Sequence, residues 1–303
     1  MSHADRPLLG ILLMLGFCVL APLGDATAKL LSTVLPLGML ILMRFSMQGA
    51  ILLALVAATR RPWHIPRRLF GLVVWRTLLH IAGIGFMFTA LRYLPLADAV
   101  AIAFVMPFIM LLLGKYVLGE EVGLRRLMAC VIGFIGTLLV IQPSFAEVGA
   151  PALLPLGVAV VFALFMLVTR QIVKEVDPIV LQASNGVIAT VILLPVLLIG
   201  HQLGIAELSF VRPTGHIWWL LLLIGLLGTV GHLFMSWSLR YAPSTTLASI
   251  QYVEIPFAAL VGWLIFGDWP NALASLGICI TMGAGLYVIF RERAILRASP
   301  EAG

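Results

Sequence analysis

The sequence predicts an all-α integral membrane protein with ten transmembrane helices, which form two inverted five-helix repeats and leave both termini in the cytoplasm. Three observations lead to this fold: the composition, the spacing of the apolar runs, and a motif that recurs in both halves. Hydrophobic residues make up 62% of the chain, charged residues only 11%, and the mean hydropathy is +1.12. Because a soluble domain is usually about a quarter charged, this chain has too few charges to cover a soluble core.

Ten apolar runs are each long enough to cross a hydrocarbon core of ~30 Å, which takes about 20 helical residues. Turn residues and charges between the runs place the spans at 8–28, 35–57, 70–92, 95–118, 124–142, 152–173, 178–200, 217–240, 243–266 and 272–291. Pro95 and Pro243 are expected to begin helices, because a proline in the first turn loses no hydrogen bond.

The basic residues predict the orientation. With the N-terminus inside, only Lys29, Arg92 and Arg212 of the 19 basic residues fall outside, and Arg44 falls within the second span. The others fall on the inner side, as the positive-inside rule requires. The net charge of +6 therefore reflects membrane orientation, and we expect lipid headgroups rather than nucleic acid beside these residues.

A repeat divides the chain into halves at 8–142 and 152–291. The recurring motifs are Leu91-Arg92-Tyr93-x-Pro95 with Leu239-Arg240-Tyr241-x-Pro243, Pro107-Phe108 with Pro256-Phe257, and Gly119-Glu120 with Gly267-Asp268. Because five helices per half is an odd number, the second half enters the membrane from the opposite side. Inverted repeats are typical of secondary transporters, whose substrate site lies near the midplane between the halves.

A further pattern consists of Pro36 followed by Met43-Arg44-Phe45, the run Ala90-Leu91-Arg92-Tyr93, and Gly119-Glu120-Glu121 at the end of the fourth span. With it, residues 8–291 resemble the EamA-type transporters of the drug/metabolite transporter superfamily. The resemblance implies ten helices, both termini in the cytoplasm of a bacterium, a place in its inner membrane, and transport of amino acids, drugs or other metabolites. Within the family the chain is most similar to the YddG-like amino-acid exporters.

Glu254 is the strongest candidate for the chemistry of transport. An ionisable group near the centre of a span costs roughly 2.5–3.5 kcal/mol and usually faces the bundle interior. Its neighbours Ser249, Gln251, Tyr252 and Pro256 make this the most polar stretch at the centre of a span. Glu254 could bind a substrate ammonium, carry a coupling proton or form a structural hydrogen bond. Pro256 either frees a backbone carbonyl for the cavity or only kinks the helix.

His80 and His232 lie near the middles of the third and eighth spans, which are equivalent in the two halves. Each is either a cavity or proton site or a buried histidine hydrogen-bonded between helices. Arg44 is expected to pair with an acid or with free carbonyls. Asp25 lies four residues before Lys29, with which it is expected to form an exposed pair. Asp98 lies at the start of a helix. Both acids are expected to be structural or gating groups.

Aromatic side chains lie on the helices that the family resemblance places around a central cavity. These are Phe86, Phe104, Phe165, Trp237 and Tyr252, with Phe162 beside them. Each also fits as packing or as a lipid contact.

The leading hypothesis is a secondary transporter that exports aromatic or neutral amino acids, or related small metabolites, by alternating access. Aromatic walls with a few polar groups suit a zwitterion with an apolar side chain. The alternative is export of cationic drugs or quaternary amines, with Glu254 as counter-ion. A membrane enzyme or receptor is disfavoured, since the sequence lacks His-Glu-x-x-His and Gly-x-Ser-x-Gly motifs.

The expected partners are therefore a small-molecule substrate and the lipid bilayer. The sequence leaves the oligomeric state open and is compatible with a monomer. Cys18, Cys130 and Cys279 lie in apolar runs without metal-ligand spacing. We accordingly expect no metal and no cofactor.

Overall fold

The computed structural model describes residues 6–117, 119 and 123–298, and for some positions within the helices, Cys130 and Ser249 among them, it describes the backbone alone. Within these ranges the regular elements are helices. In chain order they are α1 (Pro7–Ser32), α2 (Leu37–Ala58), α3 (Arg67–Ala90), α4 (Leu96–Ala103), α5 (Met106–Val117), α6 (Leu124–Val148), the 3-10 turn η1 (Ala150–Leu153), α7 (Leu154–Ile172), α8 (Pro178–Gln202), η2 (Ala206–Leu208), α9 (Ile217–Tyr241), α10 (Ser244–Ile250), η3 (Gln251–Val253), α11 (Glu254–Phe266) and α12 (Ala272–Ala298).

These helices account for the ten predicted spans. In the part of the chain that the structure describes, eight segments are long and apolar enough to cross a membrane, with α4 and α5 together making one of them. The ninth predicted span corresponds to α10, η3 and α11, and the tenth to α12. The protein is therefore an all-helical, multi-pass membrane protein.

Prolines mark where helices begin. Pro36, Pro66, Pro95 and Pro243 each precede the first residue of a helix, α2, α3, α4 and α10 respectively. Proline is suited to this place because its fixed φ leads into the helix and its missing N–H costs no helical hydrogen bond. The sequence predicted this for Pro95 and Pro243.

The fourth and ninth spans are broken, which the sequence did not predict. α4 ends at Ala103 and α5 begins at Met106, just before Pro107. In the second half α10 gives way to η3, and α11 begins two residues before Pro256. Proline cannot donate to the preceding turn and clashes with it, so the paired prolines interrupt both helices at equivalent places. Pro256 does more than kink its helix.

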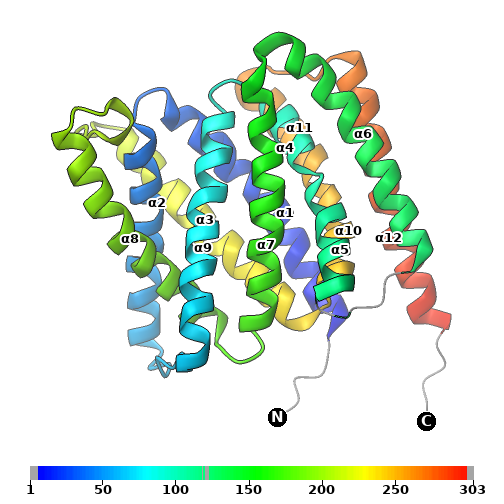
Figure 1. Cartoon of the computed structure of the whole chain (residues 1–303), viewed down its shortest axis with the longest axis horizontal. Coiled ribbons are helices and arrows are strands. Elements are labelled where there is room, and N and C mark those ends of the chain that lie inside the picture. Colours follow the sequence, from blue (N-terminus) through cyan, green and yellow to red (C-terminus); the bar gives the residue numbers. More distant parts are fainter. Residues whose placement is uncertain (1–5, 118, 120–122, 299–303) are drawn as a thin grey trace.

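The helices of one half pack on those of the other. α1 packs against α9, and α3 packs against α7, so that each pair joins one half to the other. α2 packs against α8 at one edge of the molecule and α6 against α12 at the opposite edge, while the N- and C-terminal segments emerge at the same end (Figure 1). The interior of the bundle therefore lies between the two halves.

Glycines allow two of these pairs to approach closely. A Cβ on Gly186 of α8 would lie 2.4 Å from the backbone nitrogen of Gly49 on α2. A Cβ on Gly277 of α12 would lie 2.4 Å from the carbonyl oxygen of Gly136 on α6. Small residues at helix crossings are typical of membrane proteins, where association depends on close packing.

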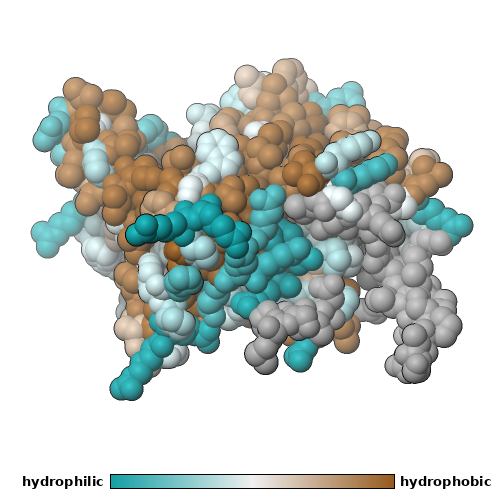
Figure 2. All heavy atoms as spheres, turned by 60° about the horizontal axis from the view of Figure 1, so that its bottom comes forward, coloured by the Kyte–Doolittle hydropathy of each residue, from teal (hydrophilic) through white to brown (hydrophobic). Residues whose placement is uncertain are grey.

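The surface is divided as a bilayer requires. Figure 2 shows hydrophilic residues gathered on the end of the bundle that carries the termini, with hydrophobic residues along the sides. Large apolar side chains such as Val191, Leu264 and Phe290 are exposed on the helices. This arrangement suits contact with lipid along the sides and with water at the end.

Candidate functional site

A cavity of about 80 Å³ lies inside the bundle, between the two halves. Two carboxylates from different halves line it, Asp25 of α1 and Glu254 at the first residue of α11. The imidazole of His232 on α9 also lines it. Buried ionisable side chains that face a cavity in a membrane bundle mark a functional site.

Aromatic rings form much of the wall. The ring centroids of Phe17 and Phe162 are 6.4 Å apart in a stacked arrangement, and Phe17 contacts His232 edge to face at 5.7 Å. Phe104, at the break between α4 and α5, lines the cavity and lies 5.5 Å from the ring of Tyr252. The cavity therefore combines flat apolar faces with two acids.

A second, smaller space of about 40 Å³ adjoins the first. Asp25 and His232 line both spaces, whereas Arg44 of α2 lines only the second. Arg44 is 3% exposed, and its Nη1 atom has no hydrogen-bond partner among the described residues. The two spaces thus run from an acidic end at Glu254, past Asp25, to a guanidinium at Arg44.

His80 and His232 lie against each other, with ring centroids 4.3 Å apart. His80 comes from α3 and His232 from α9, so the contact joins the halves. His80 is fully buried, and Phe45 and Phe165 pack on it with centroids at 4.9 Å and 4.6 Å.

The hydrogen bonds around His80 determine its tautomer. Asn185 Oδ1 accepts from Arg76 Nη1 at 3.0 Å, so the amide nitrogen of Asn185 faces His80 Nδ1, at 3.1 Å. Because that amide nitrogen can only donate, His80 Nδ1 accepts and the neutral ring carries its proton on Nε2. This Nε2 has no partner among the described residues.

His232 cannot satisfy both of its neighbours at Nδ1. That atom lies 3.2 Å from Arg44 Nη2, which donates, and 2.9 Å from the carbonyl oxygen of Gly228, which accepts. A neutral ring with Nδ1 unprotonated bonds to Arg44, and a ring protonated at Nδ1 bonds to Gly228. The protonation of His232 is therefore coupled to the hydrogen bonding of Arg44.

A second polar chain ties α2, α8 and α9 beside the histidines. Gln48 Nε2 donates to Gln182 Oε1 at 3.1 Å, and Gln182 Nε2 donates to the backbone oxygen of His232 at 2.9 Å and to Ser236 Oγ at 2.8 Å. All three polar side chains are buried. Gln48 Oε1 has no partner among the described residues, whereas the bond from Gln182 Nε2 holds the backbone of His232 in place.

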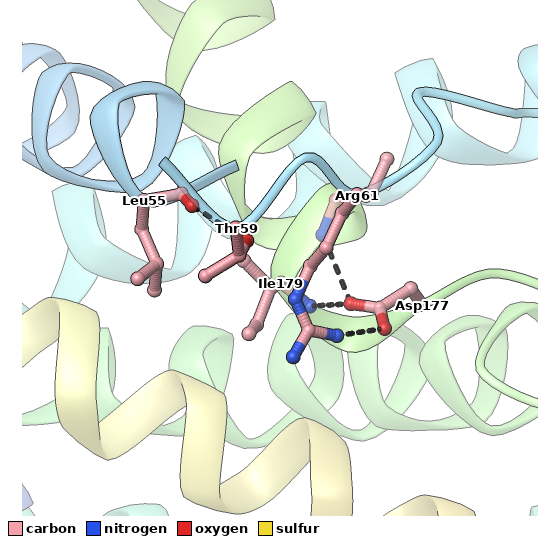
Figure 3. A network of polar contacts seen from close by, with 6 residues as sticks. Leu55, Thr59, Arg61, Asp177 and Ile179 are labelled. Carbon is pink, nitrogen blue, oxygen red and sulfur yellow. Dashed lines mark hydrogen bonds and ion pairs between the residues drawn. The ribbon is translucent and has the colours of Figure 1, made fainter. Parts of the chain in front are cut away.

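Ion pairs between the halves lie at both ends of the bundle. At the end with the termini, Arg61 Nη1 pairs with Asp177 at 2.6 Å, and Arg68 pairs with Glu175. Asp177 Oδ1 also accepts from the backbone nitrogen of Ile179 at 2.8 Å and so caps α8 (Figure 3). A carboxylate here also suits the positive end of the helix dipole.

At the opposite end Lys29 pairs with Asp268 at 3.1 Å, and Arg92 pairs with Glu207 at 2.8 Å. The hydrogen bond from Arg92 lowers the pKa of the Glu207 carboxyl below its ordinary value. Glu207 Oε2 also accepts from the backbone nitrogen of Leu37, at the start of α2. Both ends of the bundle are therefore tied across the halves, with the cavity between them.

Six of the predicted residues line the two spaces, and several others lie elsewhere. Asp25, Phe104, Phe162, His232 and Glu254 line the main cavity, and Arg44 lines the smaller space. His80, Phe165, Gln251 and Tyr252 are buried beside them, and Trp237 is partly buried. Phe86, at 38% exposure, packs against Gly157 and lines neither space. The side chain of Ser249 lies outside the described residues.

Two expectations about charged residues were wrong. Lys29 pairs with Asp268 of the other half rather than with Asp25, because Asp25 is turned into the cavity. Arg76, counted among the inner surface charges, is fully buried and bonds to Thr169 and Asn185. It lies about 14 Å along α3 from Arg67, at 1.5 Å per residue. This position within a span was the signal that could have identified it.

Asp98 is in the first turn of α4, as predicted, and accepts a hydrogen bond from Ser144 Oγ at 2.9 Å. The contact joins α4 to α6 within one half and lies away from the cavity lining. Among the residues described, no three His, Cys, Asp or Glu side chains gather as a metal site would need.

A bundle of membrane helices around a partly charged cavity between two halves defines a transporter of small molecules rather than an enzyme. Residues 8–142 and 150–291 each match the model of the EamA-like transporter family, and the chain belongs to that family. It is 30% identical to a riboflavin transporter of Rhizobium johnstonii, over 72% of this chain and 69% of the relative. It is 24% identical to an S-adenosylmethionine uptake transporter of Rickettsia prowazekii, over 97% and 96%.

One solved crystal structure shares the fold with a TM-score of 0.70. The match covers 96% of this chain and 100% of the chain in that structure, at 18% sequence identity. At this identity the likeness concerns the fold alone.

Proposed function

We propose that the protein carries zwitterionic, amino-acid-type metabolites that bear an aromatic or apolar group. The observation that supports this is the order of charges along the two adjoining spaces. Glu254 presents a carboxylate at one end, Asp25 presents a second where the two spaces adjoin, and Arg44 presents a guanidinium at the other end. The ammonium group of such a substrate would lie at the acids. The carboxylate of the substrate would accept a hydrogen bond from Arg44 Nη1, and charge-assisted hydrogen bonds of this kind are the strong ones.

The apolar part of the substrate would lie against the aromatic wall. Phe17, Phe104 and Phe162 supply flat faces beside the acids. Aromatic rings stack on one another and also attract cations to their faces. S-adenosylmethionine, named in the relatives, combines an amino-acid group with an aromatic base, and riboflavin is also aromatic, so both names agree with this wall.

Transport would proceed by alternating access between two inverted halves. The cavity of about 80 Å³ is well below the roughly 300–1,000 Å³ of ligand sites, so it must widen to admit a metabolite. The cross-half ion pairs at each end are the contacts that would break in turn as one end opens. Inverted repeats provide two such arrangements of similar energy.

We place the protein in a bacterial inner membrane with both termini in the cytoplasm, and we propose export as its direction. The distribution of basic residues supports the orientation. The resemblance to YddG-like exporters supports the direction and an aromatic or neutral amino acid as cargo. One copy of the chain contains both halves and the cavity, which supports a functional monomer.

Flux through proteoliposomes tests the proposal. Liposomes with the purified chain should accumulate more labelled phenylalanine, tryptophan or S-adenosylmethionine than empty liposomes do. Vesicles preloaded with the labelled compound should release it. Both measurements are made with and without a pH gradient.

Glu254→Gln, Asp25→Asn and Arg44→Gln should each reduce transport roughly 10- to 100-fold, because each removes a hydrogen bond to a charge worth about 1.5–3 kcal/mol. Arg67→Gln, an exposed arginine outside the cavity, is the control. No uptake of any compound in the panel would reject the proposal.

Export of organic cations is the second candidate, because two carboxylates and aromatic rings line one cavity. A quaternary amine needs the acids but has no carboxylate for Arg44. Benzyltrimethylammonium is the probe: if it is carried and Arg44→Gln leaves its flux unchanged while Glu254→Gln abolishes it, the cation function is the correct one.

A further inference from the structure

A groove of about 450 Å³ lies between α6 and α12, at the edge of the molecule and away from the central cavity. α6 contributes Arg125, Met128, Ala129 and Ile132, and α12 contributes Ile280, Gly283, Ala284 and Tyr287. Met128 and Ile132 are about half exposed, as is Tyr287. The groove therefore opens toward the surroundings of the protein.

The groove follows from how the two helices pack. They approach closely at Gly136 and Gly277, where Thr281 Oγ1 also donates to the carbonyl oxygen of Gly133 at 3.2 Å. Further toward the end with the termini, small residues leave the space between them unfilled. A Cβ built on Gly283 would meet no heavy atom within 4 Å.

The length and composition of the groove match one leaflet of a bilayer. From Arg125 to Ile132, and from Ile280 to Tyr287, each helix rises about 10 Å. The hydrocarbon part of one leaflet is ~15 Å thick. Apart from Arg125 and the Tyr287 hydroxyl, the lining side chains are apolar. On a lipid-facing surface such a groove would be filled by an acyl chain rather than by water.

Arg125 determines what kind of lipid the groove would select. It lies one residue after the start of α6, at the end where both termini emerge, and its side chain is exposed. It has no ion pair with any described residue. An arginine near a membrane surface attracts anionic headgroups, and its guanidinium can hold a phosphate with two parallel hydrogen bonds.

We propose that the groove is a binding site for an anionic phospholipid. Arg125 binds the phosphodiester, and one acyl chain lies between α6 and α12 over Gly283. Tyr287, an amphipathic ring at the interface, borders the headgroup. The site is independent of the transported substrate and would hold the peripheral helix pair in the bilayer.

Native mass spectrometry of the full chain in detergent tests the headgroup. The probes are dioleoyl phosphatidylglycerol and dioleoyl phosphatidylcholine, which share their acyl chains. We expect the chain to retain phosphatidylglycerol in preference, and Arg125→Gln to lower this preference about fivefold, which corresponds to the ~1 kcal/mol of one arginine near an anionic surface. Arg67→Gln, an exposed arginine at the same end but on α3, should keep the preference. An equal loss in both variants would overturn the site in favour of general surface charge.

Filling the groove tests the acyl chain. Gly283→Leu should reduce retention of both lipids, because the leucine occupies the open space. Gly71→Leu is the matched control, since Gly71 on α3 is also exposed and also has open space around its Cβ position. Unchanged lipid retention in Gly283→Leu would overturn the proposal. A lipid-free dimer of the wild type that dissociates in Gly283→Leu would also overturn it, because a second copy of the chain would then occupy the groove.

Discussion

The imidazole rings of His80 and His232 lie with their centroids 4.3 Å apart, although the two residues come from different halves of the chain. His80 is bonded through Asn185 to Arg76, and His232 is near enough to bond to Arg44. A row of polar side chains thus crosses the bundle from one buried guanidinium to the other, and its second end, Arg44, lines the smaller of the two spaces.

Removing either ring should impair transport. His80→Ala and His232→Ala each remove one ring of the contacting pair, and His232→Ala also removes a hydrogen-bond partner of Arg44. Losing a buried hydrogen bond costs about 1–3 kcal/mol, so we expect roughly 5- to 100-fold slower initial uptake in proteoliposomes. Because the residues are in contact, the double variant should be little slower than the worse single one. Unchanged rates at every pH in both single variants would show that the pair has no part in transport.

Asn185 should be essential to stability only while Arg76 is present. Asn185→Leu leaves a guanidinium without one of its acceptors, which should cost about 1.5–3 kcal/mol. The double variant Arg76→Met with Asn185→Leu also removes the uncompensated charge of Arg76 and should therefore recover stability. Thermal unfolding in detergent measures this. A double variant less stable than Asn185→Leu would contradict it.

The crossing of α2 and α8 should not tolerate a methyl group. In Gly186→Ala the new Cβ would lie 2.4 Å from the backbone nitrogen of Gly49, so the helices must separate, at a cost of about 1–3 kcal/mol. Gly71→Ala, where the Cβ position has open space, should be neutral or gain up to about 1 kcal/mol, since alanine is the better helix former. Equal melting temperatures for the two variants would rule out close packing at Gly186.

Acid should weaken the tie between Arg92 and Glu207. The hydrogen bond from Arg92 lowers the pKa of Glu207, so its stabilisation is complete above the unfolded pKa, about 4.3, and is lost as the pH falls through the lower folded pKa. The Glu207 side chain is 55% exposed, so the effect should stay within about 1 kcal/mol. The melting temperature of wild type should exceed that of Glu207→Gln near pH 7, and the two should become equal once the pH lies below the lowered pKa of Glu207. In an Arg92→Gln background the difference at neutral pH should shrink.

Much of the site escaped prediction for reasons that particular residues illustrate. Glu254, His232 and Arg44 were found because a polar group within an apolar run costs free energy and must face the interior. Arg76 satisfies the same criterion, but it was counted with the basic residues of the inner side. Asn185 and Gln182 carry no charge, so only the hydrogen bonds to His80 and to the backbone of His232 reveal their roles.

Phe86 and Asp25 show a different limit. Both lie on predicted spans, yet Phe86 is exposed and Asp25 faces the cavity. Which face of a helix points inward depends on its rotation, and in an apolar span nearly every face is apolar. Periodicity, which orients helices in soluble proteins, therefore carries little information here.

The amino-acid sequence by itself determined the class of protein, the places of the ten spans and the division into halves, because the bilayer imposes length and hydropathy on each span separately. Only the tertiary structure decided that the fourth and ninth spans break, that Lys29 pairs with Asp268, and that His80 meets His232. These contacts join residues far apart in the chain, and they depend on how closely glycines let helices approach and on which helix surfaces face each other. Such relationships arise only when the two halves pack together.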